Sequence, residues 1–209
     1  KNYIGNNHGS VIKIGSQYYV FGHRHTNRSM YSRQGYAEKI KFEDGKFFYA
    51  ELTSSGLNKG PLRAEGTYDA GIACHLMSKE GCILCYRPTE LDCLHPAFTQ
   101  DGEDRDEDPE QYISNMRDGA KALFRYFDFR DFRPSTLSVR IRGDAEGTLL
   151  ITPGEDDKEE YARFRIRTHE QQKWEAQTAA LRCPEDAHTL CFRYVGQGFI
   201  DFRSFKFLP

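Results

Sequence analysis

Three histidines and several polar residues crowd the start of the chain. His8 follows two asparagines in GNNHGS, just before an apolar run, and His23 and His25 end the next run. Histidine changes charge near neutral pH and binds metal ions, so such a cluster is typical of a binding or catalytic site. Very little sequence precedes it that could form the rest of a site. We therefore expect the coding sequence to continue upstream of Lys1.

Cysteines offer a second source of chemistry, because thiolates bind zinc and take part in redox reactions. Two of the six form a C-x-x-C pair, whereas a structural zinc site needs four suitably spaced ligands and a thioredoxin-like motif needs a βαβ context. This favours free apolar thiols over metal or redox work, although an even number also permits disulfides. The six are Cys74, Cys82, Cys85, Cys93, Cys183 and Cys191.

Composition excludes two classes of function. The net charge of −2 argues against a nucleic-acid-binding protein, which usually has a basic face. No apolar run approaches the roughly 20 residues that span a bilayer. Basic residues outnumber acidic ones up to residue 69, and acidic residues dominate after it. This shift predicts a domain boundary near residue 70.

Short strands separated by turn signals fill the first part of the chain. We expect strands over residues 10–14, 17–23, 32–42 and 47–52, with turns such as Gly15-Ser16 between them. Four consecutive short antiparallel strands form a sheet of the propeller-blade type. One blade cannot bury both of its faces, which is a second indication that the chain belongs to something longer. Residues 53–69, rich in glycine and serine, read as a connector.

Alternating strands also dominate the second part, residues 70–209. In TLSVRIR, for example, Leu137, Val139 and Ile141 share one face, and Ser138 and Arg140 share the other. Strands at such short spacing indicate a β-sandwich. The expected strands cover residues 121–127, 136–142, 147–152, 161–167, 174–181, 188–195 and 199–207.

Two segments before these strands allow alternatives. Residues 108–119 could form a short helix capped by Asp108-Pro109, or an extended strand through Tyr112, and we choose the strand. The acidic stretch QDGEDRDEDPEQ could hold calcium, but it lacks the EF-hand pattern with glycine at the sixth position. A solvated acidic loop is the favoured interpretation.

Residues 4–42 resemble the last blade of glycoside hydrolase family 43, through GNNHGSVIKIGSQYYVFGHRHTN and YSRQGYAEKIKF. The resemblance implies a five-bladed β-propeller that hydrolyses arabinose- or xylose-containing glycans with inversion. Inverting hydrolysis needs two carboxyl groups about 6.5–9.5 Å apart. The resemblance places the catalytic aspartates and glutamate in earlier blades. None of the carboxylates in residues 1–69 matches one of these catalytic residues. They are Glu38, Glu43, Asp44, Glu51, Glu65 and Asp69.

Two supporting residues of that family have matches here. His8 matches the histidine near the propeller axis, which implies a central calcium and its waters. The alternative is a blade-edge histidine bonded to backbone, and calcium prefers oxygen ligands. Arg33, in SRQG, matches the arginine that reaches the sugar, and its alternative is a surface strand arginine. His23 and His25 fit the end of a strand and are expected to be structural or to line the cleft.

The second part resembles a family 6 carbohydrate-binding module, through EQYISNMRDGAKALFRYFDF, KWEAQTAAL and YVGQGFIDFRSFKF. The resemblance implies a jelly-roll β-sandwich whose cleft holds a sugar between a tyrosine and a tryptophan, here Tyr112 and Trp174. The asparagine of the family falls on Asp201, which accepts but, when ionised, cannot donate hydrogen bonds. Arg203 replaces an aspartate two positions later, which argues against a structural calcium there. Trp174 could instead be a core aromatic residue.

The predicted fold is therefore all-β: a four-stranded propeller-blade fragment with connector over residues 1–69, then a jelly-roll β-sandwich over residues 70–209. The predicted function is part of an inverting glycoside hydrolase, in which this chain supplies one wall of the site and no catalytic carboxylate. The alternative is a non-catalytic carbohydrate-binding or interaction module. Expected partners are an oligo- or polysaccharide, and earlier blades or another chain that cover the blade edges, with no nucleic acid and no membrane.

Overall fold

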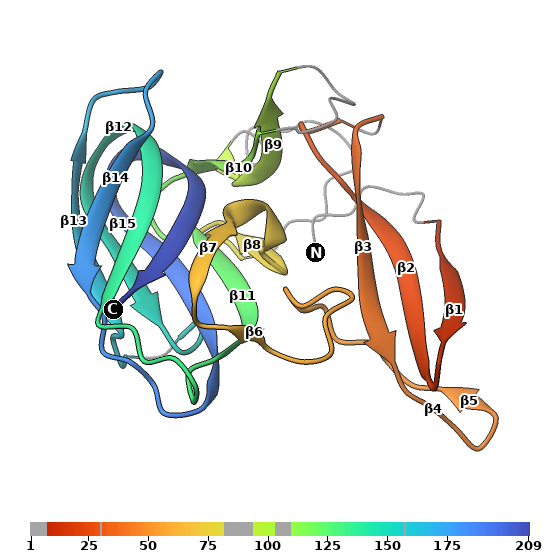
Figure 1. Cartoon of the computed structure of the whole chain (residues 1–209). Coiled ribbons are helices and arrows are strands. Elements are labelled where there is room, and N and C mark those ends of the chain that lie inside the picture. Colours follow the sequence, from red (N-terminus) through yellow and green to blue (C-terminus); the bar gives the residue numbers. More distant parts are fainter. Residues whose placement is uncertain (1–7, 30, 82–93, 103–109, 157) are drawn as a thin grey trace.

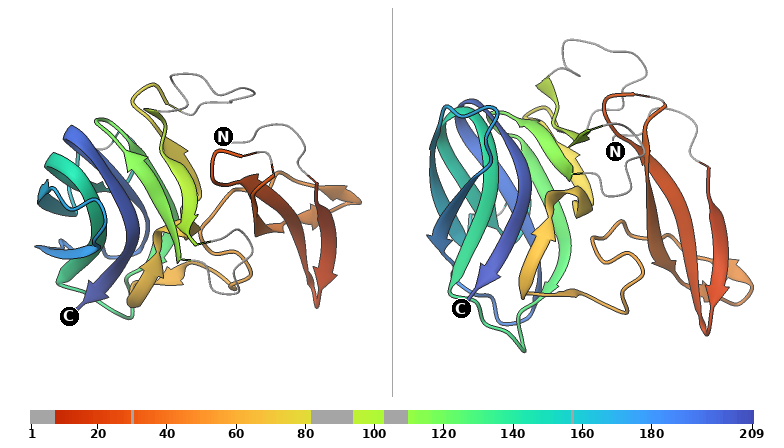
Figure 2. Two further views of the ribbon diagram at one scale, coloured as in Figure 1. Left: turned by 90° about the horizontal axis from the view of Figure 1, so that it is seen from above. Right: turned by 45° about the horizontal axis from the view of Figure 1, so that its top comes forward.

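The computed structural model describes residues 8–29, 31–81, 94–102, 110–156 and 158–209 (Figure 1). The named elements in these residues are β-strands, apart from the short 3-10 turn η1 (Ala70–Ile72). The strands form a small N-terminal sheet that stands beside a larger sandwich, as the views in Figure 2 also show. This confirms the predicted all-β class. The described residues contain no helix of the length and apolarity that crossing a membrane requires.

The small sheet has the strand order β1-β2-β3 and is antiparallel throughout. β1 (Ser10–Ile14) and β2 (Gln17–His25) turn at Gly15, whose φ of 61° suits a tight hairpin. β3 (Arg33–Ile40) returns along β2, so that Arg33 lies opposite His25. Within the described residues β1 pairs on one side only, and its five residues are all exposed.

The expected fourth strand of this sheet is wrong. Of residues 47–52, only Phe47 pairs, in a two-residue hairpin of β4 (Phe42–Glu43) with β5 (Lys46–Phe47). Beyond it the chain leaves the sheet, because its polar groups bond elsewhere: Thr53 donates its backbone N–H and its hydroxyl to the Glu38 carboxylate. The sheet of the blade-like part therefore has three strands in the described residues.

The described part of the sandwich contains ten strands, and its hydrogen-bonded path runs β13-β12-β15-β10-β9. β11 pairs with β15, β6 and β8, β14 pairs with β12, and β7 pairs with β15. The bounds are β6 (Leu62–Arg63), β7 (Gly66–Asp69), β8 (His75–Met77), β9 (Ala97–Asp101), β10 (Glu110–Met116), β11 (Lys121–Asp128), β12 (Thr136–Thr152), β13 (Ala162–Thr168), β14 (Glu175–Ala180) and β15 (Ala187–Leu208).

Two pairs of predicted strands are single long strands. β12 joins the strands expected at 136–142 and 147–152, and β15 joins those expected at 188–195 and 199–207. β12 pairs with β14 through its first part and with β13 through its second. The glycines between the expected strands lie where β12 closely approaches β15.

The predicted boundary at residue 70 is also corrected. β6 and β7 lie in the segment read as connector, yet β6 pairs with β11 and β7 pairs with the C-terminal part of β15. Tyr68 packs its ring edge-on against Phe127, with 4.9 Å between ring centroids. The strands of the sandwich therefore begin at Leu62. β6 and β7 are too short, and too close to glycines, for the alternation of apolar and polar residues to predict them.

Phenylalanines fill the sandwich core. Phe205 lies 4.9 Å from Phe124 and 5.0 Å from Phe192, centroid to centroid, and all three side chains are buried. Edge-on and tilted ring contacts of this kind stabilise a core beyond the area they bury. β13 shows the expected alternation, with Phe164 and Ile166 inward and arginines outward. The core thus fixes β10 and β15, which carry Tyr112 and Asp201 of the predicted sugar cleft.

Replacing Gly198 tests whether the close approach of β12 and β15 requires a glycine at this position. Its φ is +74°, and an added Cβ would collide with the backbone carbonyl of Asp144. We expect Gly198→Ala to lower the free energy of unfolding by about 2–3 kcal/mol, because strain and overpacking add. Urea denaturation measures this loss. Gly154→Ala, where a Cβ meets open space, is the control, and an equal loss in both variants would contradict the account.

Candidate functional site

The structure brings the three residues of the predicted sugar cleft together. Tyr112 comes from β10, Trp174 directly precedes β14, and Asp201 lies on β15. The rings of Tyr112 and Trp174 meet edge to face, with 5.2 Å between centroids and 73° between planes. The strand β10 confirms the choice of an extended conformation over a helix for this segment. Family resemblance thus located residues that are neighbours in space.

An arginine that the sequence did not single out lies among them. The guanidinium carbon of Arg142, on β12, is 4.3 Å from the centre of the Trp174 ring and 4.7 Å from that of Tyr112. A second guanidinium, that of Arg203, lies 5.7 Å from the Trp174 ring. Cations are attracted to aromatic faces, most strongly where water is excluded. The two aromatic rings are therefore covered by an arginine of the protein itself.

Two carboxylates fix Arg142 in this place. Its two terminal nitrogens donate to the two oxygens of Asp101 at 2.8 and 3.1 Å, and its Nε donates to Asp201 at 3.1 Å. Asp201 also accepts from the backbone N–H of Asn115 at 2.9 Å. Asn115 has a φ of 61° at a bulge of β10, and asparagine tolerates this conformation. The side chains of Arg142 and Asp201 are only 12% and 13% exposed.

The two carboxylates differ in acidity because they differ in burial. Burial opposes ionisation of Asp101, but the hydrogen bonds and charge of Arg142 outweigh it and lower the pKa of Asp101. Burial dominates at Asp201 and raises its pKa, although Asn115 and Arg142 act in the opposite direction. Burial also raises the pKa of the Tyr112 hydroxyl to about 12. The cluster is therefore a desolvated charge network.

In this structure the predicted sugar sandwich coincides with two aromatic rings that contact each other. A pyranose held between two aromatic faces needs van der Waals contact on both sides, which separates the rings by about 7–8 Å. The edge-to-face pair at 5.2 Å leaves no such slot. Alternation placed Arg142 on the polar face of its strand, but nothing in the local sequence indicated that Asp101 would reach it.

The residues of the predicted active-site wall gather at one end of the small sheet. His8 stacks on His23 with 6.0 Å between ring centroids, and His23 lies edge-on to His25 at 5.8 Å. His25 is buried, and Arg33 is exposed opposite it. Burial lowers the pKa of His25, and the charges of His23 and Arg33 add to the effect. The positions fit the wall of a cleft.

These residues do not by themselves fit the calcium that the resemblance implies near His8. Calcium takes six to eight oxygen ligands. The imidazole of His8 stacks on that of His23, and the described part of the chain has no group of three or more histidine, cysteine, aspartate or glutamate side chains placed to hold an ion. Most of the acidic stretch after Asp101 lies outside the described residues.

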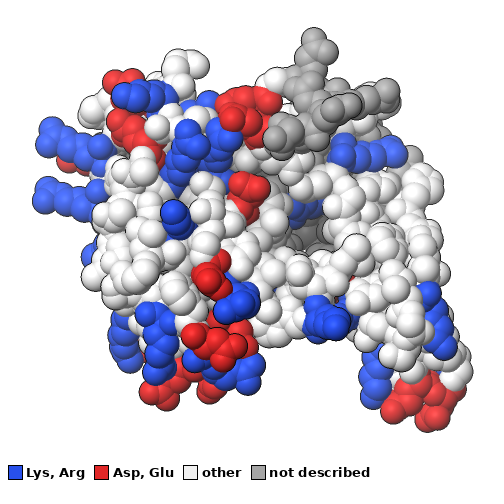
Figure 3. Space-filling model, in the orientation of Figure 1, with Lys and Arg blue, Asp and Glu red and all other residues white. Residues whose placement is uncertain are grey.

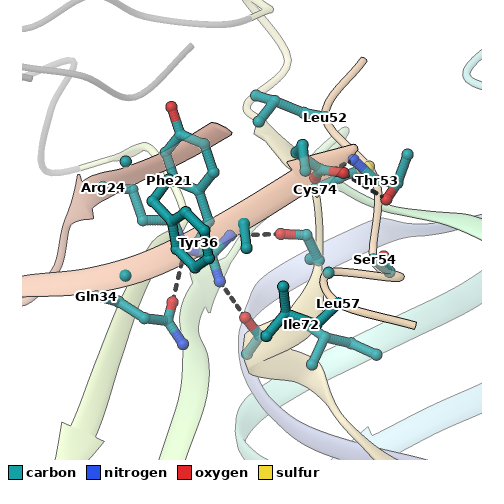
Figure 4. Close-up of a pocket in the computed structure, with 17 residues that line it drawn as sticks. Phe21, Arg24, Gln34, Tyr36, Leu52, Thr53, Ser54, Leu57, Ile72 and Cys74 are labelled. Atoms are coloured by element: carbon teal, nitrogen blue, oxygen red, sulfur yellow. Dashed lines mark hydrogen bonds between the residues drawn. The ribbon is translucent and has the colours of Figure 1, made fainter. Parts of the chain in front are cut away.

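A cavity of about 420 Å³ lies where the small sheet meets the sandwich (Figure 4). Figure 3 shows the surface hollowed between these two parts. Phe21 and Tyr36 line it from the small sheet, and Ile72 and Cys74 line it from the sandwich. The buried carboxylate of Glu38 accepts two hydrogen bonds from Thr53, and burial raises the pKa of Glu38.

Arg24 joins the two parts beside this cavity. Its guanidinium donates to Gln34 Oε1 on the small sheet at 2.6 Å, and to the backbone carbonyls of Gly71 and Ala73 in the sandwich. It also lies 3.4 Å from the centre of the Phe98 ring on β9. The polar groups around the cavity are thus hydrogen-bonded to protein atoms, which is typical of an internal interface.

The described cysteines are free thiols. Cys74, Cys183 and Cys191 form no disulfide, and burial raises the pKa of Cys74 to about 12 and that of Cys191 to about 11. Thiols held in the neutral form are poor nucleophiles and poor metal ligands. The C-x-x-C pair, Cys82 and Cys85, and Cys93 lie outside the described residues.

Comparison with known proteins finds a similar curated protein and similar solved structures. A curated protein of Thermoclostridium stercorarium, named xylosidase/arabinosidase, is 37% identical over 205 residues, which are 97% of this chain and 42% of that protein. The chain therefore spans about two fifths of the length of this curated relative. No model of a known protein family matches the chain.

Solved structures show the same two resemblances in the fold. A glycoside hydrolase family 43 arabinoxylan arabinofuranohydrolase from Bacillus subtilis matches 98% of this chain and 41% of its own, with a TM-score of 0.61 and 14% identity. A family 6 carbohydrate-binding module from Clostridium stercorarium, solved with cellobiose, matches 72% of this chain and 98% of its own, with a TM-score of 0.54 and 11% identity. The predicted resemblance to these two families is confirmed.

Proposed function

We propose that this chain is part of a glycoside hydrolase that acts on arabinose- or xylose-containing glycans by inverting hydrolysis. The name of the relative from Thermoclostridium stercorarium and its 37% identity over nearly the whole chain support this proposal. In this arrangement the small sheet is the last blade of a five-bladed propeller, and the sandwich is an accessory domain attached to it.

The exposed apolar edge of the small sheet is the observation that carries the proposal. Val11, Ile12 and Ile14 on β1 are 44%, 47% and 52% exposed, on a strand that lies at the edge of its sheet in the described residues. Soluble proteins cover such an edge, because its unpaired groups and apolar side chains bind other strands. In the proposed enzyme the preceding propeller blades cover it.

Arg33 and His8 are proposed to form one wall of the active site. Arg33 is exposed at the start of β3, where its guanidinium can donate to sugar hydroxyls or lower the pKa of a catalytic carboxyl group. His8 is proposed to orient groups near the propeller axis, and a calcium there would need oxygen ligands from other blades. The acid and base carboxyl groups that inversion requires are proposed to lie in those blades.

A carbohydrate-binding module without catalysis is the second candidate. The match of the sandwich to nearly the full length of a family 6 module favours it. Arg142 between Tyr112 and Trp174 argues against binding at the expected cleft. The small sheet, with its exposed edge, also has no role in a free-standing module.

Turnover assays separate the two candidates. The longer protein, expressed from the coding sequence that includes the upstream region, is expected to hydrolyse an aryl α-L-arabinofuranoside or an aryl β-D-xyloside. The 209-residue chain alone is expected to show no turnover above buffer, because the proposed acid and base are absent from it. Turnover by the highly purified chain, or an inactive longer protein that still binds xylan, would contradict the proposal.

A further inference from the structure

We propose that Arg142 permanently occupies the aromatic cleft of the sandwich and is the residue that excludes neutral sugars from it. The guanidinium lies against both aromatic rings, 4.3 Å from the centre of Trp174 and 4.7 Å from that of Tyr112, and so covers the ring surface on which a pyranose would stack. The sandwich then serves this protein as a structural domain. This inference goes beyond the proposed function, because it holds whether or not the longer protein is a hydrolase.

The chemistry of the cleft suits a guanidinium better than a sugar. Arg142 is flat and cationic, so it stacks on aromatic faces and at the same time donates to carboxylates in its own plane. Asp101 and Asp201 supply those carboxylates, at 2.8 and 3.1 Å from guanidinium nitrogens of Arg142. A neutral pyranose has no charge to offer either carboxylate, and its arrival would leave both without their buried cation.

The hydrogen bonds of Arg142 also oppose its displacement by a sugar. Three bonds between ionised groups hold Arg142, and such bonds are about twice as strong as those between neutral groups. A sugar hydroxyl can donate to one of these carboxylates, but it brings no positive charge and cannot reproduce the two parallel bonds that Arg142 makes to Asp101. Since Asp201 is held by Asn115 as well, rotating Arg142 out would disturb the bulge of β10. We therefore treat the arginine as a fixed part of the cleft.

The polar contacts that a sugar would use are already engaged. Asp201, which occupies the position of the expected sugar-binding asparagine, accepts from both Arg142 and Asn115. Tyr112 is only 8% exposed. The guanidinium of Arg203, which pairs with Glu110, approaches the Trp174 ring as well. Few groups remain that could orient a pyranose.

Trp174 gives a direct signal for the test, because it is the only tryptophan of the chain. The experiment compares wild-type protein with Arg142→Ser, using xylotetraose as the probe, and measures tryptophan fluorescence, acrylamide quenching and titration heat. Arg140→Ser is the matched control, since Arg140 is exposed two residues earlier on the same strand. Far-UV circular dichroism and thermal unfolding verify that each variant is folded.

We expect no saturable signal for wild type or Arg140→Ser at millimolar xylotetraose. Arg142→Ser should expose Trp174, seen as at least twofold stronger quenching, and bind xylotetraose at least tenfold more tightly than wild type. If Arg142→Ser unfolds, Asp101→Asn, which loosens the arginine while keeping every carbon of the cleft, should show increased quenching. Wild-type binding that Trp174→Ala abolishes would overturn the proposal. Equally, a folded Arg142→Ser with unchanged quenching and no binding would overturn it.

Discussion

In the longer protein, Arg33→Ala is expected to lower kcat/KM on an aryl α-L-arabinofuranoside by about 10²–10³-fold, the usual cost of losing one donor aimed at a reacting sugar. Arg33 is exposed at the first position of β3, opposite His25, at the end of the sheet where His8 and His23 also lie. A guanidinium there is a charged hydrogen-bond donor, and its interaction with the sugar becomes stronger as charge develops in the transition state. Steady-state kinetics measure the loss.

The control for this prediction is Arg165→Ala. Arg165 is also an exposed strand arginine, but it lies on β13 of the sandwich. We expect its replacement to leave kcat/KM within about twofold of wild type, as is usual for surface changes away from a site. The pH profile adds a second readout, because loss of Arg33 should raise the pKa of the proposed neighbouring carboxyl group. If Arg33→Ala and Arg165→Ala have the same kcat/KM, Arg33 is not part of the active site.

Arg24→Ala is expected to have the largest effect on stability, a loss of about 3 kcal/mol in the free energy that holds the small sheet to the sandwich. Arg24 bonds to Gln34 on one side of the interface and to the carbonyls of Gly71 and Ala73 on the other, and it covers the Phe98 ring. Its removal leaves the carbonyls of Gly71 and Ala73 without their charged hydrogen-bond donor, and it takes the guanidinium out of the cavity wall.

Hydrogen exchange resolves this effect by region. In Arg24→Ala we expect amides of β2 and β3 to exchange faster while those of β12 and β15 stay protected, because the core phenylalanines of the sandwich are untouched. Arg63→Ala is the control, since Arg63 forms only a surface ion pair with Glu65, at 3.1 Å. Uniform loss of protection in both parts would show that Arg24 does not act at the interface.

Alternation of apolar and polar residues predicted the strands whose two faces differ. β1 covers the expected residues 10–14, and β13 buries Phe164 and Ile166 as its pattern requires. Alternation did not predict the lengths of β12 and β15, which depend on how closely these two strands approach each other. The glycines at 143 and 198 resemble turn signals in sequence, yet they permit β12 and β15 to continue past each other at close range.

The candidate sites were predictable to a similar degree. Resemblance to known modules identified Tyr112, Trp174 and Asp201, which the fold brings together. It did not identify Arg142, because an arginine on the polar face of a strand is common and its two carboxylates come from distant segments. Asp101 ends β9 and Asp201 lies on β15, so only the three-dimensional pairing of the strands shows the network.

The central claim is that this chain completes a propeller and supplies one wall of a glycosidase site. Mixing the purified 209-residue chain with the separately expressed upstream segment of the longer protein tests it most directly. We predict a one-to-one complex by light scattering, with recovered hydrolysis of an aryl α-L-arabinofuranoside or β-D-xyloside that the Arg33→Ala chain fails to restore. An upstream segment that is fully active alone, with no affinity for this chain, would contradict the claim.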